Sequence, residues 1–498
     1  MEQLHTAQGC RELDRLAIEG GIEGFELMQR AGRAVFEAML QAYPRLTRLS
    51  IACGKGNNAG DGYVVARLAL EQGLGVELIQ VGEPGTLSGD AARARDAALA
   101  HGATITPTDD GEVRFSGDVI VDALLGTGIK GAPRDPYATL IAAINTSSLP
   151  VVAVDIPSGV LADNGAVPGP AVRADLTVTF IGRKIGLHTG AGAVLAGQVT
   201  YAGLGVGGDV LRQVDGIDWL TFDGVLTRHP LPKRQRGAYK QALGHLVVVG
   251  GDESMGGAPL MAAETALRAG VGMVTVVTRG THRNAILSRR PEVMVLDAGD
   301  TQLRDEVFGK ADAVVVGPGL GRRDWGASLL DAALALEKPM VLDADGLFHL
   351  AASGQRPAAP TIITPHAGEA GTLLGIGSSE VEGDRIAAAS RLAERVGGVA
   401  VLKGPGSVVA SAIGTETRCL GVCAHGNPGM ATAGMGDVLS GALGGLLGQG
   451  LPVEPAALLG VCLHSLAADR AVRRTGQMSL LATDIVPEMM DILKVAID

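Results

Sequence analysis

The sequence predicts an α/β protein of two domains, each a mainly parallel sheet with helices on both faces. Three observations lead to this prediction. The 498 residues exceed what one hydrophobic core usually organises. Short apolar segments alternate with segments of helical periodicity along both halves of the chain. Hydrophobic residues make up 46% of the chain and aromatic residues only 3%, with 73 glycines, which suits helices packed closely on a sheet.

In the N-terminal half, apolar spacing predicts helices within residues 11–43. A strand, a glycine-rich loop and a helix are then predicted at 46–53, 54–62 and 63–72, and further strands at 76–81, 119–123, 151–156 and 177–181. Two of these strands carry an aspartate near the carboxyl end, Asp122 and Asp155. Ligands bind at that end of an open parallel sheet, so both aspartates are candidate site residues.

The alternation fades near residue 205 and starts again near residue 245. Residues 206–236 lack periodicity and end in a basic, proline-containing stretch, so they are the predicted linker. A second α/β series follows, with a helix at 259–269 and strands at 246–250, 273–277, 313–316, 339–342, 361–364 and 399–402. We therefore expect a first domain at 1–215 and a second at 225–498.

The composition argues against several classes of function. The net charge of −11 is unfavourable for nucleic acids, which need a positive field. The chain lacks a run of about 18 apolar residues, and its charged, amphipathic N-terminus does not resemble a signal peptide. Five cysteines at scattered positions suit a reducing compartment. We expect a cytoplasmic homo-oligomer that binds small molecules, and neither nucleic acid nor a membrane.

The first motif, CGKGNNAGDG at residues 53–62, joins a predicted strand to a predicted helix. Its glycines let the backbone approach a ligand closely, and the helix N-terminus offers free amides to a phosphate. The spacing matches neither the Rossmann fingerprint nor a Walker loop. A simple turn would explain the glycines, but Asn57, Asn58 and Asp61 favour a binding role.

Two more polar clusters follow strands of the same predicted sheet. Asp122 leads into the GTGIKG loop at 126–131, and Asp155 leads into Pro157-Ser158-Gly159. Because parallel strands end at one edge, the three clusters should converge on one crevice. Asn58, Asp122 and Ser158 together offer oxygen ligands for a hard monovalent or divalent cation.

The combination GKGNNAGDG, VDALLGTGIKG and AVDIPSG resembles the NAD(P)H-hydrate epimerase domain, also called the YjeF N-terminal domain, over roughly residues 10–205. The resemblance implies a Rossmann-like three-layer αβα fold and a dinucleotide held by two loops. Those loops comprise Asn57, Asn58, Ala59, Gly60 and Asp61, and Gly126, Thr127, Gly128, Ile129, Lys130 and Gly131. It also implies that Asn58, Asp122 and Ser158 bind potassium, and that Asp155 contacts the hydrated nicotinamide ring as the candidate acid or base. Ala59 departs from the pattern, where glycine is common, but removes no polar atom.

In the C-terminal half, three loops carry the candidate chemistry: KGPGS at 403–407, TPHAGE at 364–369 and the stretch 427–441, which runs into a helix predicted at 438–447. The amides of Gly434, Met435 and Gly436 can form an anion hole for a transferring phosphoryl group. Asp437 lies in the first turn, placed to take a proton from a hydroxyl. A capped helix start would explain Gly-x-Gly-Asp alone, but KGPGS at strand-end spacing favours catalysis.

Together, GNPGMATAGMGDVLSG, TPHAGE, VLDADGL and KGPGS resemble the ADP/ATP-dependent NAD(P)H-hydrate dehydratase, which has a ribokinase-like fold, over roughly 225–498. By resemblance, Ala258, Gly319, His366 and Asp437 contact the hydrated nucleotide. ADP would be held by Lys403, Gly404, Pro405, Gly406, Ser407 and Gly436. Met435 replaces a more usual serine, which preserves an amide contact but not a hydroxyl contact. Asp343 and Asp345 stay outside the predicted catalytic set, because an aspartate there can cap the next helix.

The two resemblances imply repair of NADH or NADPH whose nicotinamide ring has added water. The first domain would interconvert (R)- and (S)-NAD(P)HX. The second would dehydrate the S form while ADP, with Mg²⁺, becomes AMP and phosphate. ADP is preferred to ATP because the fused arrangement resembles bacterial enzymes. Two alternatives stay open: a small-molecule kinase that keeps its phosphorylated product, and an N-terminal module that binds a nucleotide without turnover.

Overall fold

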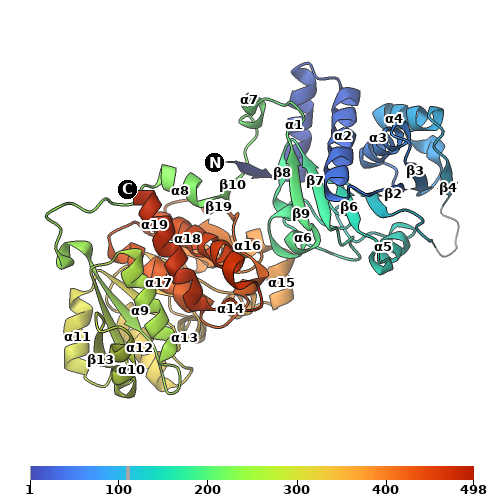
Figure 1. The fold of residues 1–498 in the computed structure, drawn as a ribbon. Coiled ribbons are helices and arrows are strands. Elements are labelled where there is room, and N and C mark those ends of the chain that lie inside the picture. Colours follow the sequence, from blue (N-terminus) through green and yellow to red (C-terminus); the bar gives the residue numbers. More distant parts are fainter. Residues whose placement is uncertain (1, 108–112, 498) are drawn as a thin grey trace. The chain divides into compact units, whose positions relative to one another are not determined.

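The computed structural model describes residues 2–107 and 113–497. Contacts divide the chain into two compact units (Figure 1), one of residues 3–217 and the other of residues 218–498 with the first two residues. The predicted linker at 206–236 contains regular structure: α7 (Gly208–Leu211), β10 (Ile217–Leu220) and α8 (Phe222–Arg228). β10 pairs in parallel with β19 (Arg418–Cys423), so this part of the stretch adds a strand to the second sheet.

The first unit contains a parallel sheet of order β4-β3-β2-β5-β6-β7-β9. Its strands are β2 (Arg48–Cys53), β3 (Gly75–Gln80), β4 (Ile105–Pro107), β5 (Val119–Ala123), β6 (Val151–Val154), β7 (Leu176–Phe180) and β9 (Gln198–Ala202). A short parallel pair is formed by β1 (Gln3–His5) and β8 (Arg183–Lys184). The direction of strand addition reverses between β2 and β5, which makes their carboxyl ends the expected ligand crevice.

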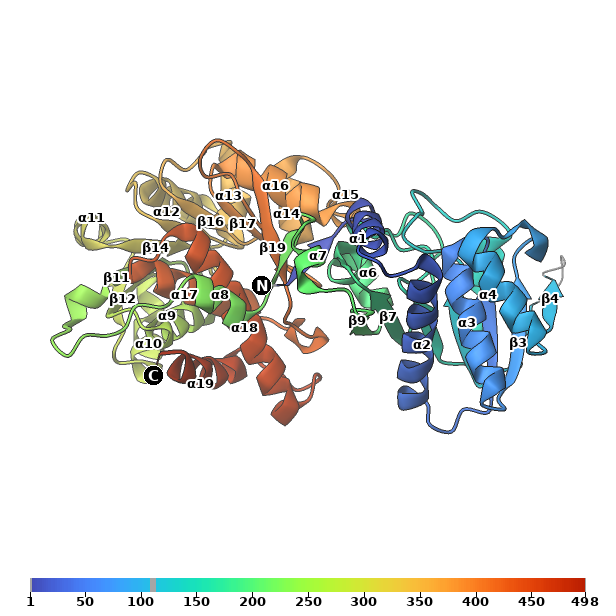
Figure 2. The ribbon, with the colours of Figure 1, turned by 90° about the horizontal axis from the view of Figure 1, so that it is seen from above.

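Helices cover both faces of this sheet, as the fold prediction requires. They are α1 (Ala7–Glu19), α2 (Gly24–Ala42), α3 (Asn57–Glu71), α4 (Gly89–Ala100), α5 (Tyr137–Thr146) and α6 (Gly190–Leu195). α2, α3 and α4 lie side by side (Figure 2) and share one hydrophobic core with the sheet. α5 contributes to a separate core on the sheet. Burial on both faces explains why the strands are continuous apolar runs. The Rossmann-like three-layer prediction is confirmed.

The predicted loop at 54–62 is wrong in one respect, because α3 begins at Asn57 rather than at Tyr63. The motif glycines had suggested a loop, but two of them serve helix packing. A methyl group on Gly60 would lie 2.6 Å from Met28 Sδ, and one on Gly62 would lie 2.7 Å from Ala123 Cβ. The small residues therefore let the first turns of α3 approach α2 and the strand ends closely. Asn57, Asn58 and Asp61 are consequently held on a helix.

The second unit contains a sheet of order β13-β12-β11-β14-β15-β16-β17-β18-β19-β10. Its remaining strands are β11 (His245–Val249), β12 (Met273–Thr278), β13 (Met294–Asp297), β14 (Ala313–Val316), β15 (Met340–Leu342), β16 (Thr361–Ile363), β17 (Val399–Leu402) and β18 (Val408–Ser411). Only β18 pairs antiparallel to its neighbours among the strands described. The direction of strand addition reverses between β11 and β14, so a second ligand crevice is expected there.

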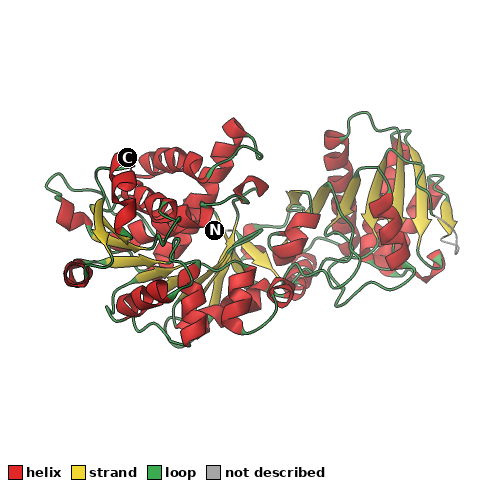
Figure 3. Cartoon of the chain, turned by 90° about the horizontal axis from the view of Figure 1, so that it is seen from below, coloured by secondary structure: helices red, strands yellow, loops and turns green. Residues whose placement is uncertain are grey.

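Helices again lie on both faces of the sheet (Figure 3). They are α9 (Gly257–Ala269), α10 (Arg283–Arg289), α11 (Thr301–Lys310), α12 (Asp324–Leu334), α13 (Asp345–Ser353), α14 (Ala367–Leu374), α15 (Ser378–Gly383), α16 (Arg385–Val396), α17 (Met435–Gly448), α18 (Val453–Thr475) and α19 (Ile485–Ile497). α17 lies in the main core with α9, α18 and α19. In the described part of the chain, every helix is too short or too polar to cross a bilayer.

The close approach of α3 to the first sheet generates a stability prediction. Gly62→Ala should destabilise the first unit by about 1–3 kcal/mol, because the added methyl meets Ala123 and lies 3.2 Å from Cys53 Sγ. The matched control is Gly309→Ala in α11, where a methyl meets no atom within 4 Å. That change should be neutral or stabilise by up to about 1 kcal/mol through helix propensity. Differential scanning calorimetry checks both, and an unchanged Gly62→Ala transition would contradict the packing argument.

Candidate active sites

The first unit has a cavity of about 580 Å³ at the carboxyl ends of its strands. Side chains from α3, the loop after β5 and the turn after β6 line it, among them Asn57, Asn58, Asp61, Gly126, Thr127, Gly128, Ile129 and Asp155. The three strand-end clusters therefore converge, as the sequence predicted. Ala59 and Gly60 are buried within α3, and Lys130 and Gly131 are exposed and are not among the lining residues. The binding roles of these residues remain predictions.

The three predicted cation ligands meet around the backbone of Leu125. Asn58 Nδ2 donates to the carbonyl oxygen of Leu125 at 3.3 Å, and Ser158 Oγ accepts from its amide at 2.8 Å. Asp122 accepts hydrogen bonds from the Ser158 hydroxyl at 2.6 Å and from its amide at 2.8 Å. Burial raises the pKa of Asp122 to about 6, although these hydrogen bonds oppose that effect.

Asp155 is anchored by a buried lysine that sequence reasoning missed. Its carboxylate forms an ion pair with Lys184 and accepts hydrogen bonds from Thr179 Oγ1 and the amide of Phe180, each at 3.2 Å. Lys184 Nζ also donates to the carbonyl oxygen of Phe180 at 3.0 Å. Burial lowers the pKa of Lys184, but the charge and hydrogen bond of Asp155, together with Cys10 and Asp14, hold that pKa above the ordinary value. The available signal was the basic pair Arg183-Lys184 in a segment, residues 176–187, that has no other charged residue.

Two more carboxyl groups line the same cavity. Burial, together with the charges of Asp155 and Asp14, raises the pKa of Asp61 well above its ordinary value. Asp14 of α1 is exposed to solvent on one side of its side chain. Partial burial of its carboxyl group raises its pKa to about 6. The sequence prediction named Asp61 as a binding residue and did not include Asp14. With Asp90, which also lines the cavity, the crevice contains four carboxyl groups and one buried ammonium group, that of Lys184.

In the second unit, the stretch 427–441 forms the expected helix start. α17 begins at Met435 after Gly434, whose φ of 89° is the left-handed conformation that glycine adopts readily. Gly436 and Asp437 therefore occupy the first turn, where backbone amides are free to bind an anion. His464 of α18 fixes this turn, since its Nε2 lies 3.0 Å from the carbonyl oxygen of Met435.

Asp437 has the electrostatic setting of a general base. Burial is the main cause that raises its pKa to about 7, and the Asp343 charge adds to it while Lys403 opposes it. A carboxyl group that titrates near neutral pH is well matched to proton transfer at that pH. The local helix start predicted from sequence therefore carries a carboxylate tuned by residues distant in the chain.

Lys403 and Asp343 form an ion pair beside the first turn of α17. Lys403 Nζ lies 2.8 Å from Asp343 Oδ1, and Ser440 of α17 donates to Asp343 Oδ2 at 2.9 Å. A methyl group on Gly436 would lie 3.4 Å from Lys403 Nζ, so the lysine is next to the free amides. Burial disfavours the charged form of Asp343, but the charge of Lys403 and its hydrogen bond hold the pKa of Asp343 below the ordinary value. Leaving Asp343 out of the predicted site overlooked this contact.

Asp345, also left out of the predicted site, makes a different contact. Its carboxylate accepts a hydrogen bond from the amide of Gly321 at 3.0 Å and pairs with Arg322 at 3.0 Å. It lies in the first turn of α13, but the N-cap position is Ala344. Asp345 therefore ties α13 to the loop after β14, and the capping role considered for the DADG aspartates is not observed.

The KGPGS loop follows β17 and rests on a buried arginine. Arg385 donates hydrogen bonds to the carbonyl oxygens of Leu402 and Lys403, each at 3.1 Å. Its guanidinium occupies the space beside Gly404, where a methyl group would lie within 2.8 Å. Gly404 and Pro405 are exposed, while Gly406 and Ser407 are half-buried. Arg385 therefore fixes the buried side of the loop, while its exposed side is accessible to a ligand, as a phosphate-binding loop requires.

The remaining predicted contacts lie at the same edge of the sheet. Ala258 is in the first turn of α9, and a methyl group on Gly319 would lie 3.2 Å from its Cβ. His366 is the N-cap of α14, where its Nδ1 accepts from the amides of Gly368 and Glu369 at 3.0 and 3.3 Å. Its side chain is 61% exposed, so the capping role leaves the ring accessible. Substrate contact by these three residues remains a prediction.

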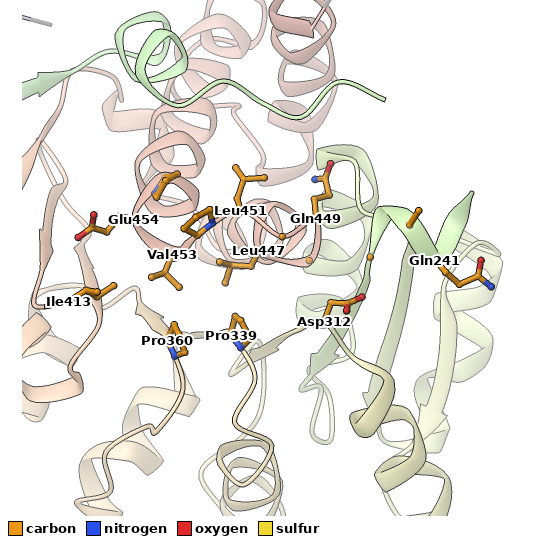
Figure 4. Close-up of a pocket in the computed structure, with 16 residues that line it drawn as sticks. Gln241, Asp312, Pro339, Pro360, Ile413, Leu447, Gln449, Leu451, Val453 and Glu454 are labelled. Atoms are coloured by element: carbon orange, nitrogen blue, oxygen red, sulfur yellow. The ribbon is translucent and has the colours of Figure 1, made fainter. Parts of the chain in front are cut away.

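A separate cavity of about 630 Å³ lies at the opposite edge of the second sheet (Figure 4). It is lined by residues just before the amino ends of three strands, Asp312, Pro339 and Pro360, and by the connection between α17 and α18. Leu447, Leu451 and Val453 make it largely apolar. Asp437, at the other end of α17, does not contribute to it. Cavity size therefore does not identify the reacting groups.

Comparison with known proteins relates both units to one family. Residues 24–186 match the model of the YjeF-related protein N-terminus, and residues 246–490 match that of NAD(P)H-hydrate dehydratase. A bifunctional NAD(P)H-hydrate repair enzyme from Coxiella burnetii is 46% identical over 490 residues, covering 98% of this chain and 99% of that protein. Its counterpart from Escherichia coli is 44% identical, covering 95% and 90%.

Solved structures match the second unit. A ribokinase-like superfamily protein from Enterococcus faecalis has a TM-score of 0.52 at 28% identity, covering 56% of this chain and 96% of that one. The ADP/ATP-dependent NAD(P)H-hydrate dehydratase from Bacillus subtilis, co-crystallised with ATP and Mg²⁺, has a TM-score of 0.50 at 27% identity, covering 56% and 98%. The ribokinase-like prediction is confirmed. Given its two matched domains and its full-length relatives, the chain belongs to the family of bifunctional NAD(P)H-hydrate repair enzymes.

Proposed function

We propose that this chain repairs hydrated NAD(P)H in two steps. The first unit interconverts (R)- and (S)-NAD(P)HX, and the second dehydrates the S form while ADP becomes AMP and phosphate. The observation that carries the second step is the position of Asp437, in the first turn of α17 beside the Lys403–Asp343 pair. A base, a cation and free amides at one helix start are the groups that phosphoryl transfer to a hydroxyl needs.

In the dehydration, the Asp437 carboxylate takes the proton of the ring hydroxyl. The hydroxyl oxygen then attacks the terminal phosphorus of ADP, and the bond to the bridging oxygen breaks, which releases AMP. The phosphate ester leaves with its C–O bond electrons as the ring nitrogen donates its lone pair. Loss of a proton from the neighbouring ring carbon restores the double bond. Lys403 and the Gly436 amide stabilise the charge on the transferring group.

Mg²⁺ fits this site as an ion bound together with the nucleotide. Lys403 Nζ lies 2.8 Å from Asp343 Oδ1 and 3.9 Å from Glu369 Oε2. Because Lys403 is expected to contact the phosphates of ADP, these two carboxylates lie near the expected phosphate position. Mg²⁺ is usually held by one or two carboxylates plus substrate phosphates. When bound, it would neutralise the charge of the nucleotide. The Bacillus subtilis relative co-crystallised with ATP and Mg²⁺ supports this expectation.

Potassium fits the crevice of the first unit. Asn58, Asp122 and Ser158 bring amide, carboxyl and hydroxyl oxygens together beside the carbonyl oxygen of Leu125. Burial raises the pKa of Asp122, and a bound cation would favour its ionised form. When bound, the ion would order the loop at 126–131 against α3. Titration of potassium against the thermal transition of the Asp122→Asn variant tests this ligand set.

We further infer that the protein is cytoplasmic and forms a homo-oligomer. The five cysteines are all free, and four of them are buried, which suits a reducing compartment. Light scattering after size-exclusion chromatography measures the oligomeric state directly. A monomer at micromolar concentration would contradict the proposed oligomer and would have no bearing on the proposed reactions.

Replacing Asp437 by asparagine should abolish the base while preserving the shape of the helix start. We expect phosphate release from ADP and (S)-NAD(P)HX to fall at least about 100-fold, because general-base catalysis contributes about 10²–10⁴-fold. Epimerisation by the same chain should be unchanged. The matched control is Asp324→Asn, an exposed aspartate in the first turn of α12. Retention of phosphate release by Asp437→Asn would exclude this residue as the base, and accumulation of phosphorylated hydrate by the wild type would indicate a kinase.

The pH dependence of dehydration follows from the same carboxyl group. Asp437 must be ionised to accept a proton, so the rate should fall as the pH drops through about 7, which gives the pH profile an acid limb.

Asp343→Asn removes a negative charge that raises the pKa of Asp437, so the acid limb of the pH profile should move down by about one pH unit. The same variant should raise KM for ADP, because Lys403 loses its anchor. Stopped-flow absorbance at 340 nm across pH 5–9 measures the limb, and an unmoved limb in Asp343→Asn would contradict the assignment.

A further inference from the structure

Two carboxyl groups of the first crevice have opposite surroundings. Asp155 has a cationic partner, Lys184, and two hydrogen-bond donors. Asp61 lines the same cavity, yet within residues 2–107 and 113–497 its carboxyl group has no hydrogen bond and no ion pair. A partly buried carboxyl group without a hydrogen-bond or ion-pair partner favours its protonated form, whereas the donors around Asp155 hold its carboxylate oxygens in place. The crevice therefore holds one proton acceptor and one proton donor.

The charges around Asp61 come from several elements and mostly repel a carboxylate. Asp14 of α1 and Asp155 after β6 both act on it, and Lys184 of β8 partly offsets them. Arg11, Lys55 and Asp90 are the other charged residues that line the cavity. Burial, together with the charges of Asp155 and Asp14, raises the pKa of Asp61 well above its ordinary value, which favours the protonated form.

We propose that Asp61 is the general acid and Asp155 the general base of the epimerisation, with Lys184 as the positioning residue that holds the Asp155 carboxylate in place. This assignment rests on the proposed epimerase function of the first unit. It gives Asp61 a chemical role in addition to its predicted part in holding the dinucleotide. Pairs of carboxyl groups whose environments push their pKa values apart are the usual basis of acid and base roles in one site.

The proposed step balances in atoms and charge. Asp61 donates its proton to the ring hydroxyl, the C–O bond breaks, and water leaves as the ring nitrogen forms a double bond to the carbon. Water then adds to the other face of that carbon, its oxygen lone pair forms the new C–O bond, and Asp155 accepts the released proton. The proton returns from Asp155 to Asp61 through solvent in the open cavity. The reverse reaction starts from the form in which Asp155 holds the proton.

A role in binding alone would have a different kinetic signature. If Asp61 only held the dinucleotide, its loss would raise KM for the hydrate and leave kcat largely unchanged. If it donates the proton, its loss lowers kcat and removes the alkaline limb of the pH profile, since the acid is inactive once deprotonated.

The test measures conversion of (R)- to (S)-NADPHX by chromatography from pH 5 to 10, using the full chain. Asp61→Asn is expected to lower kcat at least about 100-fold with KM within about threefold, and to lose the alkaline limb. Asp61→Glu restores a donor and should regain part of the rate. Asp14→Asn removes a like charge, so it should move the alkaline limb to lower pH. Asp96→Asn, on the exposed face of α4, is the inert control.

Dehydration of (S)-NADPHX by the second unit of each variant shows that the chain is intact, and thermal unfolding shows that the first unit is folded. The proposal is overturned if folded Asp61→Asn keeps kcat, keeps the alkaline limb, or changes KM alone. Wild-type protein that does not accelerate epimerisation above the uncatalysed rate would overturn the proposed function, and this inference with it. An active wild type beside an unaffected Asp61→Asn would overturn only the inference.

Discussion

An ion pair between a lysine and an aspartate is the interaction on which the chemistry of each unit depends. Lys184 binds Asp155 in the first unit, and Lys403 binds Asp343 in the second. Removing one partner of such a pair typically costs about 3–5 kcal/mol, because the other charge is left buried and alone. Each pair lies at the carboxyl edge of a parallel sheet, where strand ends bring together residues distant in the chain. The charges of each pair thereby contribute to the pKa of the neighbouring carboxyl group, Asp61 in the first unit and Asp437 in the second.

In both crevices a second carboxyl group lies close to the pair without a cation of its own. Asp61 is held above its ordinary pKa by burial and by two carboxylates, which favours the protonated form. Asp437 also has a raised pKa, but Lys403 limits the rise, and the value of about 7 leaves it largely able to accept a proton near neutrality. The same residue type thus serves as donor in one unit and acceptor in the other. The balance between burial and the nearest ammonium group accounts for the difference.

The alternation of apolar strands and helices predicted the central strands of both sheets, because strands buried on two faces leave a clear signal. The strands toward the sheet edges were not predicted, namely β4, β9, β13, β18, β19 and β10. The helix start at Asn57 was not predicted, since glycines that allow close helix packing look like loop glycines in sequence. Asp437 was found because its neighbours in the chain form the site. Lys184 and Asp343 were missed because their partners lie 29 and 60 residues away, and local motifs carry no information on such contacts.

The two proposed reactions differ in where their driving force comes from, and this explains why the two sites differ. Epimerisation exchanges two hydrates of similar free energy, so acid and base need only lower a barrier. Dehydration in water is driven by cleaving a phosphoanhydride, so its site must also bind and neutralise phosphate, as Lys403 and the free amides of α17 do. Removal of the S hydrate then draws the R hydrate through the epimerisation by mass action. One chain can therefore clear both hydrates by free diffusion of its substrate between the sites.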